Sequence, residues 1–463
     1  MARHYRFQSA LIGREWANDV QVAVGDDGLI QAIGPEAATA SGVEHVGGYV
    51  VPGMPNGHSH AFQRGMVGET EYRLSARDSF WTWRQAMYAL ANRVTPRDLE
   101  VLATQLFIEM LKSGYTSVAE FHYLHRGPDG TLGTGSNPLW DAATAAAETA
   151  GIGLTFLPTL YQTSDFGSKP LRPDQARFQL DTDWFLRAIE ERLSAERRLK
   201  TSLRRTGAAF HSLRAVPLES LRQAVEGLRG IDPDMPVHIH IAEQMKEVEA
   251  CREFSGRRPI ELLLETGLVN PRWCLVHATH ATPAELEGIA AASAAVCVSI
   301  STEANLGDGF FDAPRFLRAG GRICVGSDSQ ATVCPAEELR WMEYQARLRK
   351  RRRSVLAEGS RSHVGTRLWR DAAEHGGAVL GQPVGSIAVG SRADWLVLDA
   401  GHPSMVGSSA QTALDRLLFA GGSGAVRDVM VAGRWVVKGR QHAAEAASLA
   451  AFAGLMGRLG AAA

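Results

Sequence analysis

The chain has 463 residues, of which 45% are hydrophobic and 21% are charged, and its formal net charge is -1. This composition is that of an ordinary soluble globular protein, and the near-zero charge argues against a broad nucleic-acid or membrane surface. No stretch is apolar for long enough to span a bilayer, and the N-terminus has no apolar signal core. We expect one large domain and a smaller one, because a chain of this length exceeds a single simple core.

Both ends of the chain carry short strand-like segments. Alternating apolar residues between Gly-containing turns predict strands over 7–11, 20–24, 29–33, 393–398, 426–431 and 434–437. We therefore predict a small β-sandwich domain assembled from residues 1–52 and 380–463, with a helix in its Ala-rich C-terminal tail.

The middle of the chain, residues 53–379, alternates between amphipathic helical stretches and short apolar runs. Helices are predicted over 95–113, 139–150, 183–197, 218–228, 259–266 and 283–292. The apolar runs are 117–121, 153–157, 237–241, 274–277, 295–298 and 323–328. Repeated strand–helix units indicate parallel strands with right-handed crossovers. Their number favours a (β/α)8 TIM-like barrel over a doubly wound sheet, and in such barrels the chemistry lies at the C-terminal strand ends.

The cysteines and one basic run bear on location and partners. There are five cysteines, odd in number and widely spaced, with no C-x-x-C pair: Cys251, Cys274, Cys297, Cys324 and Cys334. This pattern suits a reducing compartment, so we expect a cytoplasmic protein. The middle three lie in apolar runs, where a thiol behaves as a small buried hydrophobe. The basic run 347–353 is typical of a solvated helix end, although a phosphate or targeting role stays open.

Histidines and acids stand at or near the ends of the apolar runs. His58 and His60 follow a β-branched run, and strand side chains alternate, so imidazoles two residues apart point the same way. Later runs add further residues of this kind: His240, Glu243, His277 and Asp328. Converging imidazoles and a carboxylate are typical ligands of a divalent metal. The set therefore predicts a metal site at the barrel mouth.

This arrangement resembles the amidohydrolase superfamily, and within it the mononuclear-zinc deaminase branch. The resemblance covers essentially the whole chain, including the split β domain, and a closer one is to the formimidoylglutamate deiminase family. Five segments carry the closer resemblance: 55–63, 120–123, 211–216, 275–280 and 301–309. It implies hydrolysis of N-formimino-L-glutamate to N-formyl-L-glutamate and ammonia, a step of histidine degradation.

The resemblance also implies a role for each residue of the set. It implies one divalent metal, with zinc favoured and iron left open, held by four ligands: His58, His60, His240 and Asp328. A bound metal lowers the pKa of water to about 7. An amidine nitrogen leaves poorly until it is protonated, and Glu243 would carry that proton from water to the departing nitrogen. His277 would orient the attacking water, and Asp328 would accept its proton.

The same resemblance places five residues around a dicarboxylate substrate: Gln63, Arg84, Tyr123, His211 and Arg214. The planar fork of arginine suits bidentate carboxylate binding. Arg84 lies among aromatic residues in the segment 81–84, which can wall a pocket. Which group holds which carboxylate stays open.

Several alternatives remain open. His238 and His280 are expected to be structural, and the roles of His122 and His125 are undecided. Lys200 could bridge two metals if it were carbamylated, but its surroundings are those of a solvated helix end, which favours one metal. The rival functions are a sister deaminase acting on a purine, pyrimidine or adenosine-type ring, and a non-catalytic barrel scaffold. We expect no nucleic-acid or membrane partner, and a homodimer, since relatives of this branch are commonly dimers.

Overall fold

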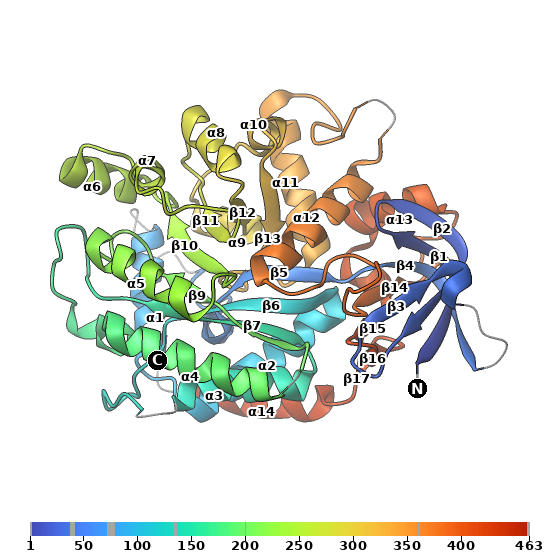
Figure 1. Cartoon of the computed structure of the whole chain (residues 1–463), viewed down its shortest axis with the longest axis horizontal. Helices are drawn as coiled ribbons and strands as arrows, with labels where there is room; N and C mark the ends of the chain where they lie inside the picture. Colours follow the sequence, from blue (N-terminus) through green and yellow to red (C-terminus); the bar gives the residue numbers. More distant parts are fainter. Residues whose placement is uncertain are drawn as a thin grey trace.

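The structure is a computed structural model that describes residues 2–37, 42–71, 79–133, 137–199, 201–359 and 362–460. It contains a barrel of parallel strands wrapped by helices and, to one side, a mixed sheet that both termini build (Figure 1). In Figure 1 the blue N-terminal strands lie beside the red C-terminal ones, far apart in sequence. The predicted (β/α)8 barrel with a separate β unit from both ends is confirmed.

Within the described ranges, eight parallel strands form the barrel. In order around it they are β5 (Met54–Ser59), β6 (Tyr115–His122), β7 (Gly153–Leu160), β9 (Ala208–Phe210), β10 (Val237–Ile241), β11 (Trp273–His277), β12 (Ala295–Val298) and β13 (Arg322–Val325), with β8 (Arg204–Thr206) paired to β7 outside this path. The ring closes through a parallel bridge between Ser59 and Asp328. There the backbone N–H of His60 donates to the carbonyl of Asp328 at 3.1 Å. The first and last strands therefore meet at predicted site residues.

Helices follow the strands and cover the outside of the barrel. They are α1 (Phe80–Ala91), α2 (Pro96–Ser113), α3 (Pro138–Ala150), α4 (Thr182–Leu199), α5 (Leu218–Ile231), α6 (Met245–Ser255), α7 (Pro259–Glu265), α8 (Pro283–Ala291), α9 (Ile300–Leu306), α10 (Ala313–Arg318), α11 (Pro335–Lys350) and α12 (Val364–Leu380). Local sequence explains their ends: α2 begins with a capping box between Thr95 and Asp98 and ends at Gly114, whose φ is 113°. Because helices cover them, β6 and β7 are buried at every position.

Eight strands of the described chain form the mixed sheet, in the order β17-β16-β15-β14-β4-β1-β2-β3. They are β1 (Arg3–Ile12), β2 (Glu15–Val24), β3 (Ile30–Ile33), β4 (Val43–Pro52), β14 (Trp395–Leu398), β15 (Val426–Val431), β16 (Arg434–Lys438) and β17 (Gln441–His442). The sheet encloses its own apolar core, in which Phe7 and Trp395 meet edge to face at 5.1 Å. Strands from the two ends of the chain thus share one core.

The remaining elements connect the sheet to the barrel. They are α13 (Ala410–Arg416), α14 (Glu445–Gly460), the 3-10 turns η1 (Gly34–Ala37), η2 (Ala61–Met66), η3 (Pro173–Phe178) and η5 (Gly422–Ala425), and the π turn η4 (Leu417–Gly421). Helix α14 lies on α2, where Ser448 donates to Gln105 at 3.0 Å. The side chains of Arg392 and Asp394 are fully buried and paired at 2.6 Å, and Arg392 also donates to the carbonyl of Ser202 at 2.7 Å. Because the two parts share such contacts, the boundaries 1–52, 53–379 and 380–463 stay a prediction.

Other expectations concern the cysteines, the basic run and membrane spans. All five cysteines are free; Cys334 is half-buried and the other four are buried. The basic run 347–353 lies mostly exposed at the end of α11, as expected of a solvated helix end. In the described part of the chain, no helix combines the length and apolarity that crossing a membrane requires.

Candidate active site

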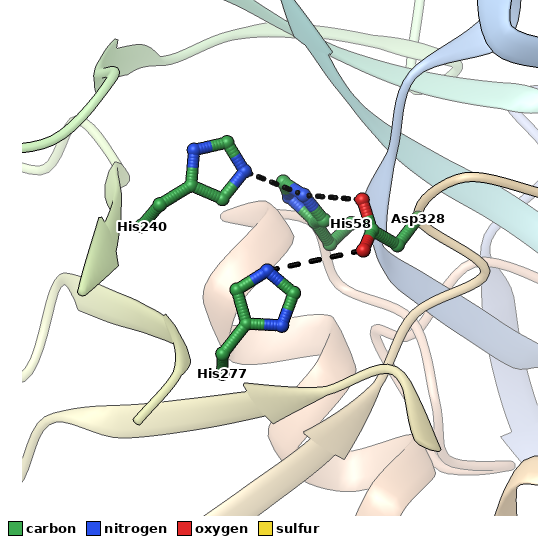
Figure 2. A group of neighbouring side chains, drawn as sticks. All are labelled: His58, His240, His277 and Asp328. Atoms are coloured by element: carbon green, nitrogen blue, oxygen red, sulfur yellow. Dashed lines mark hydrogen bonds and ion pairs between the residues drawn. The ribbon is translucent and has the colours of Figure 1, made fainter. Parts of the chain in front are cut away.

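The predicted metal ligands come together at the barrel mouth. His58 lies in β5 with His60 just after it, His240 lies in β10, and Asp328 follows β13. Figure 2 shows His58, His240 and His277, from three strands, and Asp328, from the segment after β13, pointing toward one another. The Nε2 atoms of His58 and His240 are 3.0 Å apart. His60 completes the group, with its Nε2 3.1 Å from that of His58 and 3.3 Å from that of His240.

Backbone hydrogen bonds orient two of these rings. Nδ1 of His60 lies 2.8 Å from the carbonyl of Phe121, and Nδ1 of His240 lies 2.9 Å from the carbonyl of His211. Because a carbonyl only accepts, each Nδ1 carries the proton and each Nε2 presents a lone pair. Two lone pairs that face each other at 3.3 Å repel unless a cation lies between them. The arrangement therefore fits a metal ion bound through Nε2.

The charge states of the group also fit a cation. Burial lowers the pKa of His58 to about 3 and lowers those of His60 and His240, so these imidazoles are neutral. Burial would raise the pKa of Asp328, but the rings of His58, His277 and His60 together outweigh burial and lower it, which keeps the carboxylate ionised. Three neutral imidazoles and one carboxylate suit a divalent ion such as zinc.

His277 lies next to the four predicted metal ligands. Its Nε2 lies 3.8 Å from a carboxylate oxygen of Asp328 and 3.8 Å from one of Glu243, and its backbone has a φ of 71°. On the other side its Nδ1 lies 3.3 Å from the fully buried carboxylate of Glu303. Burial lowers the pKa of His277, but the three carboxylates, Glu243 foremost, raise it to about 10. Sequence reasoning missed Glu303, because nothing local marks a contact between β11 and α9.

Glu243 lies where the chain turns after β10. Ala242 has a φ of 51°, and the backbone N–H of Glu243 donates to the Glu247 carboxylate at 3.3 Å. The Glu243 side chain is buried, and burial raises its pKa to about 7. A carboxyl group that titrates near neutral pH can both accept and deliver a proton. Its surroundings therefore suit the shuttle role predicted for it.

A small cavity of about 50 Å³ opens next to the ligand group. All five predicted substrate residues line it: Gln63, Arg84, Tyr123, His211 and Arg214. Trp83 also lines it, as expected of the aromatic residues in segment 81–84. Four further lining residues were missed by sequence reasoning: Phe80, Met87, Tyr88 and Leu306. His60, His240, Glu243, His277 and Asp328 form its floor, and His58 is fully buried. The pocket lining and the buried His58 together comprise every predicted site residue. The role of each residue stays a prediction.

Two arginines line the pocket, one against aromatic rings and one buried. Arg84 lies over the rings of Trp81 and Tyr88, at 4.4 and 5.5 Å from their centroids. Arg214 is buried and its Nε has no hydrogen-bond partner. In the described ranges, no carboxylate lies within ion-pair distance of either guanidinium, although the charges of Glu247 and Glu243 outweigh burial and help to raise the pKa of Arg214. On the opposite wall Gln63 donates to the Tyr123 hydroxyl at 2.8 Å.

Most of the other histidines form structural contacts. Nε2 of His238 lies 2.8 Å from the carbonyl of Val379, and His280 lies outside the pocket lining. His122 and His125 each lie within hydrogen-bond distance of a backbone carbonyl, at 2.7 and 2.8 Å. Lys200, the candidate bridge between two metals, lies outside the described residues.

A family model described as "Amidohydrolase family" matches residues 49–436. The chain belongs to the amidohydrolase family. This amidohydrolase is 49% identical to formimidoylglutamate deiminase of Pseudomonas aeruginosa over 98% of both chains. It is 28% identical to 5-methylthioadenosine/S-adenosylhomocysteine deaminase of Nitratidesulfovibrio vulgaris, over 88% of this chain and 85% of that one. Among solved structures it is similar to an amidohydrolase from Brucella melitensis, with a TM-score of 0.91, 40% identity and 99% of both chains covered.

Proposed function

We propose that this amidohydrolase hydrolyses the formimino group of N-formimino-L-glutamate, giving N-formyl-L-glutamate and ammonia, as a step of histidine degradation. The near full-length similarity to a formimidoylglutamate deiminase supports the reaction. The pocket supports the substrate class, because a dicarboxylate needs cationic partners.

The observation that carries the proposal is the pair of arginines in one pocket. Arg84 and Arg214 both line the cavity above the histidines, and neither forms an ion pair in the described part of the chain. Arg84 is partly buried and Arg214 is buried near the carboxylates of Glu247 and Glu243, and a bound carboxylate would offset the remaining cost of withdrawing each cation from water. Two such groups match a substrate with two carboxylates. A neutral base would find no counterpart for either charge.

A divalent ion held by His58, His60, His240 and Asp328 would supply a Lewis acid that lowers the pKa of a water molecule. Asp328 has one carboxylate oxygen 3.8 Å from Nε2 of His277, so these two groups can hold and orient that water between them. Water adds to the formimino carbon and gives one proton to Asp328, while Glu243 gives a proton to the terminal imino nitrogen, which becomes an amino group. Glu243 then carries the second proton of the water oxygen to that amino group, the bond from carbon to it breaks, the formyl carbonyl forms and ammonia leaves. The proton held by Asp328 returns to Glu243 and restores both carboxyl groups. The arginines keep the formimino carbon over these groups by gripping the carboxylates.

A substrate panel tests the proposal. The purified enzyme is assayed for ammonia release from N-formimino-L-glutamate, guanine, cytosine and 5-methylthioadenosine. We expect release from formiminoglutamate alone, with one equivalent of N-formyl-L-glutamate. Activity on a base alone would favour the sister-deaminase alternative. Failure on every substrate, despite a stoichiometric bound ion, would favour a non-catalytic scaffold.

Three further points belong to the proposal. Zinc, at one ion per chain, is our choice of metal because neutral imidazoles and a carboxylate suit it, and metal analysis distinguishes it from iron. A cytoplasmic location fits five free thiols, since such thiols persist in reducing compartments. A homodimer without nucleic-acid or membrane partners is proposed as well, and light scattering measures the oligomeric state directly.

A further inference from the structure

The ring of Trp81 contacts two cations. The guanidinium of Arg84 is 4.4 Å from the centroid of that ring, and the ammonium of Lys246 is 4.6 Å from it. Arg84 comes from the same helix, α1, whereas Lys246 belongs to α6, three residues after Glu243. Cations are attracted to the face of an indole ring, so this contact ties α1 to α6 next to the pocket.

The contact continues along α1 as a ladder of alternating cations and rings. Residues 81, 84 and 88 are spaced i, i+3 and i+7, which places them on one face of the helix. Arg84 also lies over the ring of Tyr88 at 5.5 Å, and Arg172 lies over that ring at 5.4 Å. Arg172 is neutralised by Asp174 at 3.0 Å. In the described ranges, neither Arg84 nor Lys246 forms an ion pair.

We propose that Trp81 and Lys246 are positioning residues that hold Arg84 for a substrate carboxylate. The idea rests on the proposed function, because it assigns Arg84 a carboxylate ligand. A guanidinium that lies on aromatic rings keeps its N–H groups free at the edge, where a carboxylate binds through two parallel hydrogen bonds. An arginine without such support loses rotamer freedom when it binds a carboxylate, and this loss of conformational entropy weakens binding. Lys246, from α6, contacts the same ring and holds Trp81 in place.

The position of Trp81 in the ladder predicts which kinetic parameter its substitution changes. Trp81 does not line the cavity, whereas Arg84 does. A loss of Trp81 therefore acts on substrate affinity through Arg84 and leaves Glu243 and the histidines in place. We expect a change in KM with little change in kcat, because the contact is present both in the ground state and in the transition state.

The experiment compares Trp81→Leu, which removes the ring face, with Trp81→Phe, which keeps one. Lys246→Met and Lys246→Arg form the matching pair for the second cation. Trp341→Leu and Lys350→Met are controls, because both residues are exposed on α11, away from the pocket. Each variant is assayed with N-formimino-L-glutamate, and its affinity for glutarate is measured by isothermal titration calorimetry. Thermal melting checks that each variant is folded.

We expect Trp81→Leu to raise KM and the glutarate Kd about 3- to 30-fold, the range of a partly desolvated cation–π contact. Trp81→Phe and Lys246→Arg should recover most of the affinity, and the controls should match wild type. In an Arg84→Met background, Trp81→Leu should have no further effect, because its influence passes through Arg84. An undiminished effect in that background would overturn the idea, as would wild-type glutarate affinity in both Trp81→Leu and Lys246→Met.

Glutarate binding separates this idea from the proposed function. If wild type binds glutarate but does not turn over formiminoglutamate, the proposed reaction fails and the variants still decide the role of Trp81. If wild type binds no dicarboxylate, Arg84 has no carboxylate to hold and the ladder idea fails. Should Trp81→Leu not fold, the comparison of Lys246→Met with Lys246→Arg supplies the same test at an exposed residue.

Discussion

The ring of His240 donates from Nδ1 to the backbone carbonyl of His211, at 2.9 Å. One hydrogen bond thus joins a proposed metal ligand to the loop that carries His211 and Arg214. The bond sets the tautomer of His240, and it also holds that loop in position next to the end of β10. Metal binding and the shape of the substrate pocket are therefore coupled through the backbone.

Removal of the metal should abolish activity. Dialysis against a chelator is expected to yield an inactive protein with a lower melting temperature, because a ligand that binds only the folded state stabilises it. Added zinc should restore both. His240→Ala should lose the ion, while His238→Gln, two residues away on the same strand, should keep it. Elemental analysis and calorimetry measure these effects, and full activity in metal-depleted protein would contradict the proposed centre.

Glu243→Gln should lower kcat by about 10²- to 10⁴-fold, the usual contribution of a positioned acid or base. Metal content and melting temperature should stay at the wild-type values, because glutamine has nearly the same shape. Glu249→Gln serves as the control, since Glu249 is exposed on the next helix, α6. Steady-state kinetics provide the test. A rate within twofold of wild type would remove Glu243 from the proton transfer.

Arg214→Met should raise KM about 10- to 100-fold, because a hydrogen bond between charged groups contributes about 1.5–3 kcal/mol. The melting temperature should fall at most slightly, because the buried Arg214 charge forms no ion pair in the described chain and interacts with Glu247 and Glu243 only at longer range. Arg84→Met should behave in the same way. Arg222→Met, on the exposed face of α5, is the control. Wild-type kinetics in both pocket variants would exclude the two arginines as carboxylate ligands.

Arg392→Met should destabilise the protein by about 3–5 kcal/mol, because it leaves the buried Asp394 without its partner. Urea unfolding followed by circular dichroism measures the change. The exposed pair of Arg6 and Asp19 provides the contrast, and Arg6→Ala should leave the unfolding midpoint unchanged. Equal effects of the two substitutions would show that burial of the inner pair has no consequence for stability.

The barrel and its metal-binding mouth could be predicted because both depend on local patterns. Period-two alternation places His58 and His60 on one side, and parallel strands bring their C-terminal ends to a common edge. One detail differs from expectation: the apolar run 323–328 is a strand only to Val325. Gly326 passes so close to His58 that an added Cβ would lie 2.8 Å from the Cβ of His58, and the chain leaves the sheet there.

The wall formed by α1 could not be predicted from the apolar pattern. Its sequence reads as aromatic and polar residues rather than as an apolar stripe, although Ser79 and Thr82 form a capping box at its start. Phe80, Met87 and Tyr88 reach the pocket only because the helix folds over the barrel mouth. Glu303 was missed for a related reason, since its contact with His277 joins segments 26 residues apart.

The seam at which β5 meets β13 and closes the barrel has a consequence for how the enzyme assembles. His58 and His60 lie at one side of that seam and Asp328 lies at the other, 270 residues away from His58 along the chain (328 − 58 = 270). A nascent polypeptide cannot offer the full set of donor atoms until its last barrel strand has left the ribosome and met the first. Binding of the ion should therefore be a late step of assembly, and an ion bound there would hold the first and last strands of the barrel together.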